Sequence, residues 1–158
     1  MSAVATFSNV DHALTTEPED PKKAAILIVT SDRGLAGAYS SSVIKEAERL
    51  VEKLKGEGKD VDLYASGRKA EAYFKFRQRA VVQAWTGFSD QPTYDVAAEI
   101  GATLIAAFLA DGEDSDSDVR DVDEVHVVYT RFRSMLSQEP TAVRLLPLPL
   151  HHVPQLAG

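Results

Sequence analysis

A short apolar run in this chain passes through a polar turn directly into a helical pattern. Residues 26–29 read Ile-Leu-Ile-Val, and three of the four are β-branched. Such a run predicts a strand that is buried on both faces, as in a parallel sheet. Ser31, Asp32 and Gly34 then supply turn chemistry, and from Leu35 the apolar residues recur at helical spacing. This strand, turn and helix together predict an α/β fold.

The rest of the chain alternates between the same two patterns. We expect further strands at residues 61–65, 80–85 and 124–129, and a last extended segment that stops at residues 147–149. We expect helices at residues 35–54, 67–79 and 92–112. Strands that alternate with helices predict a largely parallel sheet of about five strands with helices on both faces.

A chain of 158 residues suits one domain. We expect a mobile leader at residues 1–23, because Pro18 and Pro21 mark a boundary there and large apolar groups are few. A single globular domain at residues 24–150 and a tail at 151–158 follow. The absence of cysteine excludes disulfides, thiolate metal sites and thiol nucleophiles. No apolar run approaches the roughly 20 residues that span a bilayer.

The excess negative charge lies in one segment. Residues 111–124 hold eight acidic residues and one arginine, which equals the net charge of −7 of the whole chain. Asp114, Asp116 and Asp118 match calcium-ligand positions 1, 3 and 5 of an EF-hand loop, but valines occupy its required glycine and glutamate positions. The segment therefore predicts a solvated acidic loop. A net negative chain also argues against a nucleic-acid partner.

The turn from Ser31 to Gly37 is a possible phosphate site, because a helix N-terminus offers free N–H groups. However, it contains only Gly34 and Gly37, not the three glycines of a dinucleotide fingerprint, and Asp32 adds a carboxylate. A structural turn in which Ser31 or Asp32 caps the helix is the favoured interpretation. A small nucleotide- or flavin-binding protein that uses this turn is the alternative.

Basic and aromatic residues are interleaved in the helix expected at 67–79. The basic residues include Arg68, Lys69, Lys75 and Arg77, and the aromatic ones are Tyr73, Phe74 and Phe76. Single-stranded nucleic acids bind to such mixtures. Helical spacing favours Tyr73 and Phe74 packing on the sheet, so we expect a surface for a protein partner instead.

Several segments, taken in order, resemble the globular domain of the gamma subunit of F-type ATP synthases. They are Thr30-Ser-Asp-Arg-Gly-Leu-Ala-Gly-Ala-Tyr39, Gly67-Arg-Lys-Ala70, Val81-Val-Gln-Ala-Trp-Thr-Gly-Phe-Ser89 and Phe132-Arg-Ser-Met-Leu-Ser-Gln-Glu-Pro-Thr-Ala-Val-Arg-Leu-Leu-Pro-Leu-Pro149. The resemblance implies a Rossmann-like domain. In that family, two long terminal helices pair into a coiled-coil shaft, and we expect this chain to lack them.

The resemblance also implies a function. It points to a non-catalytic central-stalk domain that binds the epsilon subunit and the membrane-embedded c-ring, and acts through the shaft on the alpha and beta subunits. It implies no catalytic residue, metal or cofactor, and a peripheral location at the cytoplasmic face of the plasma membrane. We expect the acidic loop, with Asp114, Asp116, Asp118 and Asp121, to face the ring. We expect Arg68, Lys69, Lys75 and Arg77 to face epsilon.

Overall fold

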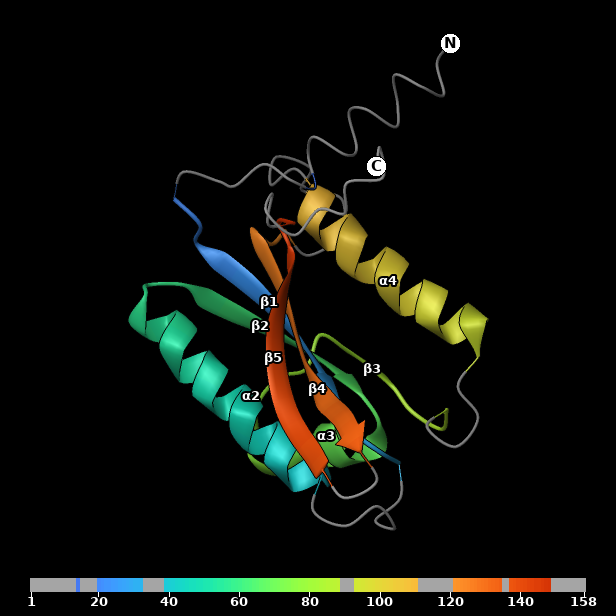
Figure 1. Ribbon diagram of the computed structural model, residues 1–158. Coiled ribbons are helices and arrows are strands. Elements are labelled where there is room, and N and C mark those ends of the chain that lie inside the picture. Colours follow the sequence, from blue (N-terminus) through green and yellow to red (C-terminus); the bar gives the residue numbers. More distant parts are fainter. Residues whose placement is uncertain are drawn as a thin grey trace, which may run out of the picture.

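The computed structural model describes residue 14 and residues 20–32, 39–88, 93–110, 121–134 and 137–148. Within these ranges, five strands form one sheet in the order β3-β2-β1-β4-β5 (Figure 1). The strands are β1 (Lys23–Val29), β2 (Asp60–Ser66), β3 (Gln83–Trp85), β4 (Glu124–Ser134) and β5 (Ser137–Leu146). The helices are α2 (Tyr39–Gly56), α3 (Arg68–Phe76) and α4 (Tyr94–Leu109).

The sheet is largely parallel, as the sequence predicted. β1 pairs in parallel with β2 and β4, β2 pairs in parallel with β3, and only β5 is antiparallel, against β4. β1 is central because its side chains are apolar on both faces. Ala24, Ile26 and Ile28 are buried in one core, and Ala25 and Leu27 in the other. The predicted α/β class is confirmed.

The helices form one layer on each side of the sheet (Figure 1). The core on the first side joins Val43, Ala47 and Val51 of α2 with Phe74 of α3. The core on the second side joins Leu104 and Ala107 of α4 with sheet residues. The two layers follow from the order of the strands. The connections from β1 to β2 and from β2 to β3 move outward in one direction, so right-handed crossovers place α2 and α3 on the same face. The connection from β3 to β4 moves back past β1, so a right-handed crossover places α4 on the opposite face.

Two strands differ in length from the prediction. β3 has only three residues, because the preceding residues close the end of α3: the N–H of Arg79 donates to the carbonyl of Phe74 at 2.9 Å. β4 continues to Ser134, well past its last pairing with β1 at Val128, because β5 supplies a partner over the added length. Both differences depend on a neighbour distant in sequence, which local periodicity does not reveal.

The division into leader, domain and tail stays a prediction, because residues 1–13, 15–19 and 149–158 lie outside the described residues. Leu14, within the expected leader, packs against the core on the α4 side. Its carbonyl accepts a hydrogen bond of 2.7 Å from the N–H of Leu148. This contact joins the two ends of the described chain.

Candidate functional site

The turn after β1 caps α3. The N–H of Arg68 donates to Oδ1 of Asp32 at 3.0 Å, and the N–H of Ala70 donates to Oγ1 of Thr30 at 3.0 Å. Between them, the N–H of Lys69 donates to the carbonyl of Ser31 at 3.1 Å. The sequence predicted that Ser31 or Asp32 caps the helix next in sequence. These contacts add a cap on a helix that begins 36 residues beyond Asp32.

Gly67 makes this arrangement possible. Its φ of 101° belongs to a region that L side chains rarely adopt, and a Cβ there would lie 2.1 Å from the carbonyl oxygen of Thr30. The close approach brings three consecutive N–H groups of α3 onto the β1 turn. Because these groups are paired within the chain, and because Asp32 places a carboxylate beside them, this helix terminus is poorly suited to phosphate.

The nucleotide alternative concerns a turn that is only partly described. Residues 33–38, which include Gly34 and Gly37, lie outside the described residues. Ser31 is buried, and its hydroxyl lies 3.1 Å from that of Ser40 in α2. The alternative stays a prediction.

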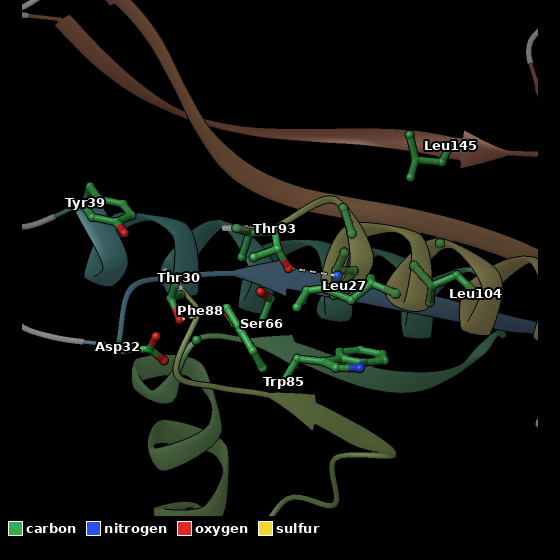
Figure 2. A pocket seen from close by; sticks show the side chains of 16 residues that line it. Leu27, Thr30, Asp32, Tyr39, Ser66, Trp85, Phe88, Thr93, Leu104 and Leu145 are labelled. Carbon is green, nitrogen blue, oxygen red and sulfur yellow. Dashed lines mark hydrogen bonds between the residues drawn. The ribbon is translucent and has the colours of Figure 1, made fainter. Parts of the chain in front are cut away.

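An apolar groove lies between α4 and the sheet, at the carboxyl ends of β1, β2 and β3. This α4 groove has a volume of about 520 Å³. Its lining includes Leu27 and Trp85 from the sheet, Ile100 and Leu104 from α4, and Leu145 from β5. Figure 2 shows Leu27 and Trp85 beside α4, with Leu145 across the groove on β5. Asp32 and Thr93 add polar groups near one end.

The apolar surface extends beyond the groove on both of its walls. Ile105 and Leu109 of α4, and Val143 and Leu145 of β5, each remain about two-fifths exposed. Val143 pairs with Val127, which packs against the core on the α4 side, so this face of β5 continues that core. Exposed apolar side chains beside an apolar groove are typical of surfaces that bind another chain. This surface was not predicted from the sequence, although the alternation of Val143, Arg144 and Leu145 was a signal for it.

The four predicted epsilon-facing residues are exposed on α3 or just after it. Arg68 and Lys69 begin the helix, Lys75 lies in its last turn, and Arg77 follows it, with its guanidinium 4.8 Å from the centre of the Tyr73 ring. The expected packing of the aromatic residues is confirmed: Phe74 is fully buried and Tyr73 packs against the same core. Phe76, by contrast, is 88% exposed.

The predicted ring-facing loop falls mostly outside the described residues. Asp114, Asp116 and Asp118 lie outside them, and Asp121 is exposed. Among the described residues, no group of His, Asp and Glu side chains could hold a metal ion. None of the described helices is long and apolar enough to cross a membrane.

A cluster of charged side chains joins the end of α2 to the start of β4. Nζ of Lys59 lies 2.8 Å from Oε1 of Glu57 and 2.9 Å from Oε2 of Glu124, and Nε2 of His126 lies 3.0 Å from Oε1 of Glu124. The side chains of Lys59, Glu124 and His126 are each at most 12% exposed. His126 lies within β4, so this cluster is anchored in the sheet.

Burial and pairing act in opposite directions on this cluster. Burial disfavours the charged form of Glu124, but hydrogen bonds with His126 and Lys59 outweigh it and lower the pKa of Glu124. Burial opposes the charge on Lys59 too, yet its two carboxylate partners raise its pKa. For His126 burial prevails over the bond to Glu124, so its pKa is lowered. The groups are paired and hold two elements together, which indicates a structural role.

Known proteins match this chain over nearly its whole length. Residues 1–156 match the family model described as ATP synthase. The chain is 71% identical over 149 residues to the ATP synthase gamma chain of a Nocardioides species, covering 94% of this chain and 47% of that one. It is 49% identical over 158 residues to the ATP synthase gamma chain of Mycolicibacterium smegmatis, covering 97% and 52%. The chain therefore spans about half the length of these relatives.

Solved structures agree on the fold. The central stalk and c-ring structure of the Tetrahymena thermophila mitochondrial ATP synthase matches with a TM-score of 0.62 at 21% identity, covering 92% of this chain and 59% of that chain. The rotor of the Euglena gracilis mitochondrial ATP synthase matches with a TM-score of 0.53 at 15% identity, covering 92% and 54%. The family match and the sequence identities show that the chain belongs to the ATP synthase family, among the gamma chains.

Proposed function

We propose that this chain forms the globular domain of a central-stalk subunit in an F-type ATP synthase, and that it is non-catalytic. In this role it binds the epsilon subunit and the c-ring and couples proton flow to ATP synthesis, as a peripheral part of the complex at the cytoplasmic face of the plasma membrane. The observation that carries the proposal is the α4 groove with its exposed apolar walls. A groove of this kind is the surface that a rotor domain needs to hold its shaft.

The shape of the groove suits a packed helix. Its floor is the sheet and one wall is α4, so an added helix would lie on the sheet beside α4 and bury Leu145 and Ile100. Helices pack with their axes about 8–10 Å apart, which side chains of this size allow. The relatives are about twice as long as this chain. The two long terminal helices that the family resemblance implies are the segments that would occupy the α4 groove.

A rotor domain must also resist torque. Side chains that are packed at crystal-like density transmit strain with little compression. The two cores of this domain share β1 as their common central strand, so force on one helical layer reaches the other through a buried strand. This stiffness requires no acid, base, metal or cofactor.

Two further surfaces belong to the proposal. Arg68, Lys69, Lys75 and Arg77 would face epsilon, because they form a basic surface on the side of the sheet opposite the groove. The acidic loop that contains Asp114, Asp116, Asp118 and Asp121 would face the ring. The described Asp121 lies just before the amino-terminal end of β4, so the loop joins the sheet at that end.

The test exchanges this domain into an intact enzyme. Residues 20–148 would replace the matching segment of the full-length Nocardioides gamma chain, and proton-driven ATP synthesis would be measured in membrane vesicles. We expect synthesis to be retained, because the exchanged surfaces are closely related. A Leu145→Asp variant should release the shaft from the groove and abolish coupling, because Leu145 lines the groove and is partly exposed, whereas Glu52→Asp, on the exposed side of α2, should not. A coupled enzyme with Leu145→Asp would refute the role of the groove.

The nucleotide-binding alternative is tested separately. Calorimetric titration of the chain with ATP and with flavin mononucleotide should give no saturable heat if the turn is structural. Ligand at about 100 times its dissociation constant would raise stability by about 2.7 kcal/mol, so a melting-temperature shift is an independent readout. Saturable binding together with failure of the exchanged domain would replace the rotor proposal.

A further inference from the structure

Phe76 projects into solvent from the end of α3. It is 88% exposed, whereas Phe74, two residues before it, is fully buried. Large apolar side chains exposed to this degree contribute nothing to the core of the domain that carries them. Protein interfaces, in contrast, obtain most of their binding energy from a few aromatic side chains that enter pockets of the partner.

The turn that presents Phe76 is held firmly. Gln78 adopts a φ of 58°, a left-handed conformation that is uncommon for a residue other than glycine. The N–H groups of Arg77 and Gln78 donate to the carbonyls of Tyr73 and Lys75, at 3.1 and 3.0 Å. These bonds fix the backbone on the carboxyl side of Phe76.

Side chains attach the same turn to α2. The guanidinium of Arg79 pairs with Glu48 of α2 and lies 5.1 Å from the centre of the Phe74 ring. The hydroxyl of Tyr73 donates to the other oxygen of Glu48 at 3.2 Å. Glu48 therefore ties two residues that flank Phe76 in sequence to a neighbouring helix. A side chain presented from a rigid turn loses little entropy of its backbone on binding.

The charges around Phe76 indicate what it binds. Lys75 and Arg77 flank it directly, Arg68 and Lys69 are exposed on the same helix, and Glu71 is the one acidic residue of α3. A face with a net positive charge, in a chain of net charge −7, is complementary to a partner surface that carries carboxylates.

The other aromatic side chains of α3 argue against a nucleic-acid partner. Bases stack on successive exposed rings. Here Phe74 is fully buried, and one face of Tyr73 is covered by the guanidinium of Arg77. A single free ring fits an apolar pocket in a protein better than a strand of bases.

We propose that Phe76 is the central contact of a docking surface on α3, and that it enters an apolar pocket bordered by carboxylates on the epsilon subunit. Lys75 and Arg77 pair with those carboxylates at the rim. This inference rests on the proposed function, which supplies the assembly in which such a subunit is found. It assigns the binding energy to Phe76 and the dependence on salt to the two flanking cations.

The test measures binding of the epsilon subunit to the full-length gamma chain that carries this domain. Phe76→Ala should weaken binding at least about 10-fold, which corresponds to about 1.4 kcal/mol. Tyr94→Ala is the matched control, because Tyr94 is a second aromatic residue that is 84% exposed, but on α4 across the sheet. Tyr94→Ala should leave the affinity unchanged. Lys75→Glu with Arg77→Glu should weaken binding and reduce its dependence on salt.

The outcomes distinguish the docking surface around Phe76 from the proposed rotor function. Because Phe76 is exposed, its replacement should leave the melting temperature unchanged, and this check separates lost binding from lost folding. Unchanged affinity in the Phe76→Ala and charge-reversed chains, with normal binding by the parent chain, would overturn the docking surface and leave the rotor proposal standing. No binding by the parent chain would overturn both epsilon docking and this inference.

Discussion

Replacing Gly67 by alanine should destabilise the domain more than any other glycine substitution among the described residues. Two costs arise at this position. The backbone, at φ 101° and ψ 143°, lies in a region that is nearly restricted to glycine and costs about 1–3 kcal/mol for other residues. The new Cβ would also lie 2.1 Å from the carbonyl oxygen of Thr30, far inside van der Waals contact.

The clash has no inexpensive relief. Thr30 is held because its N–H donates to the carbonyl of Ser66 at 2.8 Å, and its hydroxyl accepts from Ala70. Moving α3 away would weaken the three hydrogen bonds to the β1 turn, each worth about 0.5–1.5 kcal/mol. If these bonds are lost, the combined loss is at least about 2.5 kcal/mol. For a domain of this size, a loss of about 2.5 kcal/mol lowers the melting temperature by roughly 5–10 °C.

Urea unfolding followed by circular dichroism would measure this loss. Gly58→Ala is the matched control, because Gly58 also has a positive φ, of 87°, but nothing lies within 4 Å of its added Cβ. It should cost only about 1–2 kcal/mol, from the backbone alone. If Gly67→Ala costs no more than Gly58→Ala, the contact between Gly67 and Thr30 is not the constraint that we infer.

Three further predictions concern the cap, the core and the charged cluster. Asp32→Ala should cost about 1 kcal/mol in urea unfolding, because the N–H of Arg68 loses its acceptor, and Asp32→Asn should retain most of that stability. Phe74→Ala should cost about 3–5 kcal/mol by calorimetry, because it empties a fully buried site; a loss below 1 kcal/mol would contradict the packing. Stability should fall as the pH drops below 6.5, because unfolded His126 binds a proton that the folded residue, with its lowered pKa, resists. It should fall further below 4.5, where Glu124, whose pKa is also lowered, is protonated more readily in the unfolded chain. Unfolding midpoints at pH 7.0, 5.5 and 4.0 would measure both steps, and His126→Gln should remove only the first; an unchanged first step would assign it to other groups.

Several features could be read from local sequence because local physics decides them. The apolar run of β1 must be covered on both faces, and the helical spacing of α2 and the burial of Phe74 follow from a single face of each helix. The order of strands and helices then limited the chain to an α/β sheet. The ordered resemblance to gamma subunits indicated the family before any contact was known.

The candidate site depended on contacts between distant segments. Asp32 caps a helix that begins 36 residues later, and Lys59 pairs with Glu124 across 65 residues. The attachment of the end of α3 to α2 was equally hidden, because Glu48 contacts Tyr73 and Arg79 from a separate helix.

The sequence by itself determined the class of fold, the family and the burial of β1 on both faces, since these follow from hydrophobic periodicity and ordered motifs. Only the tertiary structure decided which helix the β1 turn caps, where the α4 groove lies and how the end of α3 is attached to α2. The physical reason is that capping, cavities and exposure are properties of surfaces brought together by folding. A chain encodes them through many weak contacts at long range, none of which has a local pattern.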